Sequence, residues 1–375
     1  MKTRIVNFLW VLGIMAFAGV FALTTLNHYD TPVDKKTLEI LTRSTDEDLL
    51  SKKECGSLLG IAVAPELNFQ IEGERLLSLM NNEQFYQVPK EIKGDFSKIE
   101  GCKDPCLLPK ESIRTVRGEL AEKELYLQRF DQLVQLKGAE CRNPLALKEL
   151  PLLALLKMTR WKLHQLSLWM TIGQGERVVE ELVAINDFFV ASLDREKLGL
   201  HQSLAFVAII QKARESLVKL PKIDPKVSKW TSRVSSDFYR PLSFKEIARR
   251  TEIGEMQILN VRLHGADGVR KLNGPLTKRT LASIGSEGFL ESFIQRVAEY
   301  LFLPQSTLTE AHQQISGAAA HPCIRSKTKK CPSGQRHPFE YIYNPAGKYL
   351  IDSGVAKPVL DGLQKLNKNI SKVRI

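Results

Sequence analysis

Long hydrophobic runs are almost absent from this sequence, and the one that occurs lies at its start. After residue 26 no stretch approaches the roughly 18 uncharged apolar residues that a second membrane-spanning helix requires. Runs with the alternation of a β-strand are also scarce, which argues against a sheet protein. The composition, with 43% hydrophobic and 26% charged residues, is that of a folded globular chain. We therefore expect an all-α protein with at most one membrane segment.

The sequence also lacks the motifs that most often identify an enzyme. It contains no Gly-x-Ser-x-Gly, His-Glu-x-x-His, phosphate-binding loop or Gly-x-Gly-x-x-Gly pattern. His164 and His201 fall on expected helices beside leucine and tryptophan, which is typical of core or boundary histidines. Glu180 and Glu181 are most simply part of a solvated helix face. No catalytic residue, cofactor site or metal site is predicted, although nothing rules out paired carboxylates for acid–base chemistry.

The single hydrophobic run covers residues 5–26 and contains no charged side chain. A helix of that length extends about 33 Å, enough to cross a hydrocarbon core of about 30 Å. Lys2 and Arg4 precede the run, so the positive-inside rule places the N-terminus in the cytoplasm and the rest of the chain outside it. We expect a retained membrane anchor. The alternatives are a signal peptide cleaved near Ala18 and a buried core helix.

The chain has six cysteines, an even number that invites disulfide pairing in an exported protein. The expected pairs are Cys102 with Cys106, Cys323 with Cys331, and Cys55 with Cys141. The first pair lies in a short polar turn and the second flanks a basic loop, so both would close local loops. The third pair is what remains, and free buried thiols are the alternative for it.

A metal site is the competing interpretation of the second pair. His321 and His337 bring two histidines and two cysteines together within 17 residues. Structural zinc sites usually have cysteines two to four residues apart, whereas seven residues separate Cys323 from Cys331. We therefore expect a loop disulfide rather than a zinc site or free thiols, and no metal.

Hydrophobic periodicity of about 3.6 residues dominates the rest of the chain. Helices are expected at 35–43, 46–60, near 73–82, 110–137, 145–172, 176–193, 200–219, within 224–263, and at 287–302, 305–317, 345–353 and 356–368. Gly173, Gly175 and Gly199 mark short turns, which favour antiparallel helix pairs. One helical hairpin half-matches a tetratricopeptide unit, but no second copy follows. The expected fold is an N-terminal transmembrane helix followed by an irregular multi-helix, solenoid-like domain of helical hairpins.

This fold is expected to divide into four segments along the chain. They are an anchor or uncleaved signal at 1–30, a loop-rich helical segment at 31–110, a helical core at 111–265, and a C-terminal helical segment at 266–375 with a basic loop at 320–338.

One stretch resembles the start of a DNA-binding helix-turn-helix. It runs from Phe244 to Gly254, but Glu252 stands where that motif normally has a glycine for the turn. The expected location outside the cytoplasm also argues against DNA. We interpret the stretch as an amphipathic helix with a solvated charged face, and nucleic acid is not an expected partner.

The net charge of +12 is distributed unevenly. Residues 321–375 hold eleven basic and three acidic side chains, a net charge of +8. The basic loop contains Arg325, Lys327, Lys329, Lys330 and Arg336. These residues are candidates for binding an anionic surface, such as phospholipid headgroups, lipopolysaccharide phosphates or an acidic protein. The alternative is a loop that only increases solubility.

Several short motifs occur in a characteristic order. They are Leu58-Leu59-Gly60-Ile61, Ala64-Pro65 with Gly73, the Cys102 and Cys106 pair, the glycine-broken hairpin at Gly173 and Gly175, and Asn344-Pro345-Ala346-Gly347-Lys348. The order resembles an uncharacterised family of membrane-anchored, all-helical periplasmic proteins of proteobacteria. The resemblance implies a single-pass protein of the inner membrane with a periplasmic main domain. It implies no activity and no site residues.

Location, architecture and charge together favour a non-enzymatic cell-envelope protein. It would be anchored in the inner membrane through residues 5–26 and would bind a partner or an anionic surface through its periplasmic domain. The alternatives are an envelope hydrolase with a dispersed active site and a structural subunit of an inner-membrane complex.

Overall fold

The computed structural model describes residues 32–42, 49–81, 105–136, 138–264, 304–320 and 356–373, with Met15, Ala18 and Gly19. Every regular element among them is a helix and none is a strand, which confirms the all-α fold class. The chain forms two compact units, each assembled from two stretches of sequence. One unit comprises Met1–Arg43 and Leu259–Asp361, and the other comprises Ser44–Ile258 and Gly362–Ile375.

Among the described residues, no helix is both long and apolar enough to cross a membrane. The predicted anchor at 5–26 lies outside them, apart from three residues, and stays a prediction. The same holds for the helices predicted at 287–302 and 345–353 and for residues 321–338 of the basic loop.

The first unit contains helices α2 (Lys35–Thr42) and α15 (Pro304–Ala320), which a hydrogen-bonded threonine connects. Asp34 caps α2, because its carboxylate accepts hydrogen bonds from the Thr37 amide at 2.9 Å and the Thr37 hydroxyl at 2.7 Å. The Thr37 oxygen lies 2.6 Å from His312 Nδ1, which therefore donates to it. Burial alone would raise the pKa of the Asp34 carboxyl, but hydrogen bonds from Thr37 and Lys36 lower it below its usual value.

The second unit holds most of the described helices. They are α3 (Leu49–Gly60), α4 (Phe69–Asn81), α5 (Lys110–Ala121), α6 (Glu124–Val134), α7 (Pro144–Glu149), α8 (Leu152–Thr171), α9 (Gly175–Leu193), α10 (Leu200–Ile223), η1 (Pro225–Val227), α11 (Ser228–Thr231), η2 (Ser236–Tyr239), and parts of α12 (Phe244–His264) and α17 (Ala356–Lys372).

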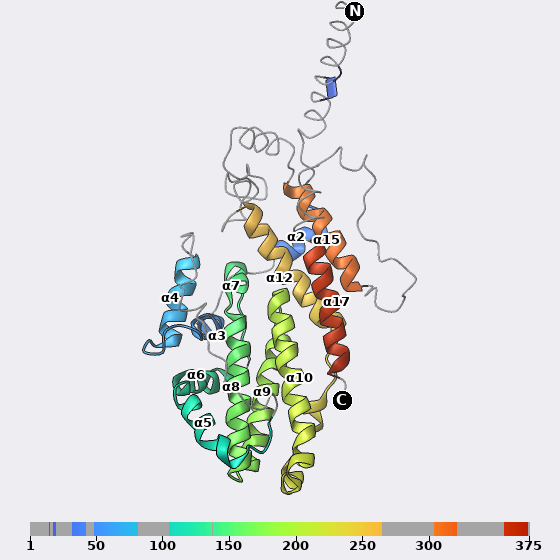
Figure 1. Ribbon diagram of the computed structural model, residues 1–375. Helices are drawn as coiled ribbons and strands as arrows, with labels where there is room; N and C mark the ends of the chain where they lie inside the picture. The colour runs from blue at the N-terminus through green and yellow to red at the C-terminus, as the bar shows by residue number, and fades with distance from the viewer. Residues whose placement is uncertain are drawn as a thin grey trace, which may run out of the picture. The chain divides into compact units, whose positions relative to one another are not determined.

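Three long helices form the centre of this unit. Helices α8, α9 and α10 run antiparallel and side by side (Figure 1), as the short glycine turns predict. Gly173 has a φ of +84°, a left-handed conformation that only glycine adopts without strain, and it ends α8. Phe189 contacts Phe206 and Phe188 edge to face, with centroids 5.0 and 4.9 Å apart. Burial of each such side chain stabilises the unit by about 1.5–3 kcal/mol.

Two helices that we predict as continuous are broken in the structure. The helix predicted at 110–137 ends at Ala121 and restarts at Glu124, although the intervening residues are good helix formers. The helix predicted at 145–172 is interrupted before Leu152 by Pro151, which lacks the amide proton that an uninterrupted helix needs there. Local sequence therefore explains the second break, whereas residues 122 and 123 carry no such signal for the first.

The helix predicted near 73–82 begins earlier than expected, at Phe69. Asn68 explains the difference, because its side-chain oxygen accepts hydrogen bonds from the amides of Gln70 and Ile71 at 3.1 and 3.2 Å. This is the contact of an N-cap, which satisfies amides that have no partner within the helix.

Candidate functional site

Helices α3 and α4 form a hairpin in which glycines allow close contact. A Cβ added to Gly60 would overlap the carbonyl of Phe69, and a Cβ on Gly73 would overlap the carbonyl of Gly56. Neither position accepts a side chain without separating the helices. Gly60 and Gly73, which belong to the motifs described above, therefore have a packing role here.

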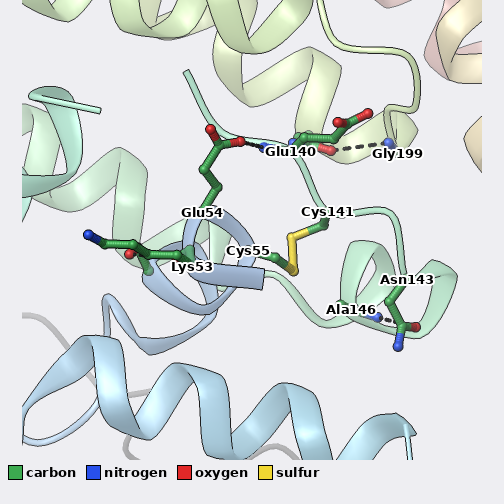
Figure 2. The surroundings of a disulfide bond; sticks show 10 residues. Lys53, Glu54, Cys55, Glu140, Cys141, Asn143, Ala146 and Gly199 are labelled. Carbon is green, nitrogen blue, oxygen red and sulfur yellow. Dashed lines mark hydrogen bonds between the residues drawn. A yellow bond between two sulfur atoms is a disulfide. The ribbon is translucent and has the colours of Figure 1, made fainter. Parts of the chain in front are cut away.

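A buried disulfide joins this hairpin to the helical core (Figure 2). Cys55 on α3 pairs with Cys141, with a Cα–Cα distance of 4.7 Å, and both residues are fully buried. The predicted pairing is thus confirmed, and the alternative of free thiols does not hold for it. Cys106 is also disulfide-bonded, but Cys102 lies outside the described residues, so the pairing of these two stays a prediction.

Glu54 strengthens the same junction. One carboxylate oxygen accepts a hydrogen bond from the Glu140 amide at 3.1 Å, and the other lies 3.0 Å from the Arg195 guanidinium. Glu140 in turn pairs with Arg142 at 3.2 Å. Both cysteines of the disulfide therefore follow a buried glutamate (Figure 2). Each of these glutamates has an arginine as its partner.

Arg129 on α6 holds the loop between α3 and α4. Its guanidinium donates to the carbonyls of Val63, Ala64, Pro65 and Leu67 at distances of 2.6 to 2.9 Å. These carbonyls follow the end of α3, where helix geometry provides no amide partners. Burial lowers the pKa of Arg129 from its ordinary high value, and the guanidinium still satisfies four backbone acceptors at once.

Lys162 on α8 is the most deeply buried cation with two acidic partners. Its side chain is 0% exposed, and Nζ lies 2.7 Å from Asp131 on α6 and 3.0 Å from Glu181 on α9. The contact with Asp131 is an ion pair rather than a well-aligned hydrogen bond. Nζ also lies 4.7 Å from the ring of Trp169, on which the guanidinium of Arg177 stacks at 3.7 Å.

The carboxylates of this cluster are partly open to solvent. The side chains of Asp131 and Glu181 are 33% and 24% exposed. Burial raises the pKa of the Asp131 carboxyl, and Lys162 lowers it in part. One fully buried ammonium thus links α6, α8 and α9. Removing it would leave two neighbouring carboxylates without their shared cation.

Several buried side chains keep polar atoms without hydrogen bonds, and two of them are the basic residues His164 and Arg214. Both ring nitrogens of His164 on α8 have no partner, and the residue is fully buried. Arg214 on α10 donates to Asn186 at 2.9 Å and to the carbonyl of Arg240 at 3.0 Å, while one amino group has no partner. Burial lowers the pKa of both side chains.

The structure changes the interpretation of several residues singled out in the sequence. His164 is buried but not hydrogen-bonded, whereas His201 is exposed. Glu180 is exposed as predicted, but Glu181 belongs to the Lys162 cluster. The candidate anion-binding residues Arg325, Lys327, Lys329, Lys330 and Arg336, like Cys323 and Cys331, lie outside the described residues.

The stretch from Phe244 to Gly254 that resembles a helix-turn-helix lies within one continuous helix, α12, with no turn at Glu252. Glu252 is buried, so the face predicted to be solvated is only partly so. Gly254 is needed for a different reason, because a Cβ there would overlap the carbonyl of Leu198. The structure therefore supports the interpretation as a packed helix and corrects the extent of its solvated face.

The residues missed in the sequence are those whose partners are distant in the chain. Arg129 and Lys162 lie in amphipathic helices where a charged residue ordinarily faces water. Among the described residues, no group of three His, Cys, Asp or Glu side chains is arranged to hold a metal ion. No protein family model, no curated protein and no solved structure matches this chain.

Proposed function

We propose that this chain is an exported, non-catalytic helical protein that binds an anionic surface or partner in the cell envelope. The observation that carries this proposal is the buried Cys55–Cys141 disulfide, which ties α3 to the core. Disulfides of this kind persist in oxidising compartments and are rare in the cytosol. The hydrophobic segment at 5–26 supports the same location, with the main domain outside the cytoplasm and the segment in the inner membrane.

The internal use of charge supports a binding role rather than a catalytic one. Arg129 binds four carbonyls, Lys162 joins two carboxylates, and Glu54 joins an amide to Arg195. Each of these groups connects segments that are distant in the chain, and its partners lie within the fold itself. This arrangement fits a rigid scaffold whose surface makes the contacts with a partner.

The basic loop supplies the surface contact in this proposal. Arg325, Lys327, Lys329 and Lys330 lie within six residues of one another. Basic clusters bind anionic membrane surfaces with about 1 kcal/mol per charge. Phospholipid headgroups and lipopolysaccharide phosphates offer the same anionic chemistry at the envelope.

A flotation assay tests the loop. The full-length chain, reconstituted in zwitterionic nanodiscs, is mixed with phosphatidylglycerol-containing vesicles, and the fraction that floats with the vesicles is measured. We expect flotation of the unmodified chain, and a clear reduction when Arg325, Lys327, Lys329 and Lys330 are changed to glutamate, because attraction at the loop becomes repulsion.

A matched control separates the loop from total charge. Glutamate at Lys52, Lys53, Arg114 and Arg117, which are exposed on α3 and α5, changes the net charge by the same amount. This control should float nearly as well as the unmodified chain. Equal flotation of the loop variant and the unmodified chain would contradict the proposal, as would equal losses in the loop variant and the control.

A further inference from the structure

One end of the second unit combines exposed apolar side chains with a surplus of basic ones. It consists of residues 105–110, 172–177 and 222–233, which we call the bundle-end surface. The α8–α9 turn and the end of α10 both lie at this end of the antiparallel helices, at the lower edge of Figure 1.

Direct contacts bring the three segments of the bundle-end surface together. The Leu108 amide donates to the Thr171 hydroxyl at 2.9 Å, which places residues 107 and 108 beside the end of α8. A Cβ on Gly175, at the start of α9, would lie 2.8 Å from Val227 and 3.3 Å from the ring of Trp230. The surface is therefore continuous from the segment before α5 to α11.

The apolar part of this surface is open to solvent. Leu107 is 50% exposed and Ile172 is 47% exposed, and Trp230 is half-buried. The ammonium of Lys229 lies 4.1 Å from the Trp230 ring. A tryptophan beside a lysine at the edge of apolar side chains is the arrangement favoured at the boundary between lipid headgroups and acyl chains.

Basic residues outnumber acidic ones around these side chains. The exposed basic residues are Lys110, Arg177, Lys222, Lys226, Lys229 and Arg233. The acidic ones are Glu176 and Asp224, with Glu111 directly after the first segment. Asp224 is half-buried, and its carboxylate accepts a hydrogen bond from the Lys226 amide at 3.0 Å. The charge therefore complements an anionic surface.

We propose that the bundle-end surface is a second membrane contact, which docks on a bilayer rich in anionic lipid. Leu107, Ile172 and Trp230 would enter the headgroup region while the basic side chains meet the phosphates. These three residues project from a chain segment, a helix cap and a helix of four residues, and the described residues offer no strand edge to which a peptide could add. This inference extends the proposed function, because both surfaces take the same class of partner.

Tryptophan quenching distinguishes this surface from the basic loop. The full-length chain in zwitterionic nanodiscs is mixed with brominated phosphatidylcholine and phosphatidylglycerol vesicles in about a 3:1 ratio, which gives an anionic surface of biological strength. The chain has four tryptophans, of which Trp161 and Trp169 are 2% and 9% exposed and Trp10 lies in the predicted anchor. Bromine on the added vesicles should therefore reach Trp230 alone.

We expect quenching with anionic vesicles, weaker quenching with brominated phosphatidylcholine alone, and no quenching in Trp230→Phe. Replacing Lys226, Lys229 and Arg233 by glutamine should weaken vesicle binding by this surface about a hundredfold, at about fivefold per charge. Leu107→Ser with Ile172→Ser should reduce quenching and leave the salt dependence unchanged. Circular dichroism of each variant checks that it is folded.

The outcomes separate the two proposals. Absence of quenching in the unmodified chain, or its persistence in Trp230→Phe, overturns the bundle-end surface. Loss of flotation in the basic-loop variant still supports the proposed function in that case. Conversely, quenching that survives the basic-loop substitutions supports the bundle-end surface even where the loop makes no contribution.

Discussion

At the scale of single residues, Arg129 makes the most hydrogen bonds between distant parts of the described chain. It donates hydrogen bonds to four carbonyls of the α3–α4 loop. A methionine in its place would have a similar length but no donor for any of them. Hydrogen bonds from a charged donor contribute about 1.5–3 kcal/mol each, and they do not add fully. We therefore expect Arg129→Met to lower the free energy of unfolding by about 3 kcal/mol or more, measured by urea denaturation.

An exposed arginine provides the control for Arg129. Arg75 pairs with Glu72 at 2.7 Å, but its side chain is 62% exposed. Arg75→Met should change stability by about 0.5 kcal/mol or less. Arg129→Lys should recover only a small part of the loss, because an ammonium lacks the planar fork that reaches four acceptors. Similar losses of stability on substitution of Arg129 and Arg75 would show that contacts other than those of Arg129 hold the α3–α4 loop.

His164 gives a prediction about pH. Burial lowers the pKa of its imidazole below the ordinary value of 6.5, and the nearby Arg160 lowers it further. Below about pH 6.5 the unfolded chain binds a proton at this imidazole that the folded protein does not bind. The contribution of His164 to stability is therefore present above that pH and is lost as the pH falls below it. The loss is about 1.4 kcal/mol per pH unit until the folded imidazole also titrates.

His164→Leu should therefore flatten the decline in stability between pH 7.5 and 5.5. It should cost little at pH 7.5, because it removes two buried nitrogens that have no partner. Urea midpoints at the two pH values measure the effect. His201→Leu, at an exposed position on the next long helix but one, should leave the slope unchanged. If stability declined with pH as steeply in His164→Leu as in the unmodified chain, the His164 imidazole would not be the source of the pH dependence.

At the scale of helices, the α3–α4 hairpin depends on residues without side chains. Gly73→Ala would force the added methyl against the Gly56 carbonyl, so the helices must separate. Overpacking of this kind costs about 1–3 kcal/mol. Gly118→Ala on α5 is the matched control, since nothing lies within 4 Å of its added Cβ. It should stabilise the helix by about 0.5–1 kcal/mol. In urea denaturation, we therefore expect the free energy of unfolding to fall in Gly73→Ala and to rise in Gly118→Ala.

The helices also show how far sequence patterns reach in this protein. Periodicity located α9 to within one residue and placed the start of α10 correctly, since Gly173, Gly175 and Gly199 mark these limits, whereas α10 continues past its predicted end at 219 to Ile223. It did not predict the break at residues 122–123, where no local signal exists. Pro151 did provide a signal for the second break. Helix existence is thus a local property here, whereas helix interruption depends partly on tertiary packing.

The charged clusters were less accessible to prediction than the helices. Lys162, Asp131 and Glu181 come from three different helices, and no spacing along the chain relates them. The Cys55–Cys141 pair was identified only by elimination among the six cysteines. Composition indicated which residue types were present, but only the packing of α6, α8 and α9 determines which ones meet.

At the scale of the whole molecule, the second unit combines two stretches of the chain that are far apart in sequence. Residues from Gly362 onward belong to it, and a Cβ on Gly362 would overlap the side chain of Leu200 at the start of α10. The buried residues of this segment are Leu363, Leu366, Ile370 and Val373, each 3% exposed or less. The unit therefore completes its core only after residues 362–373 have been synthesised.

Truncation after Asp361 tests this dependence. Loss of four buried aliphatic side chains removes about 6 kcal/mol or more of burial free energy, which is comparable to the whole stability of an ordinary domain. We expect the truncated chain to be cleaved rapidly within α8–α10 by a low concentration of protease, while the full-length chain resists. Replacing Lys365 and Lys368 by glutamine, both exposed on the same helix, should not change cleavage. Equal resistance of the truncated and full-length chains would mean that residues 44–258 fold alone, and that the C-terminal segment only covers a finished core.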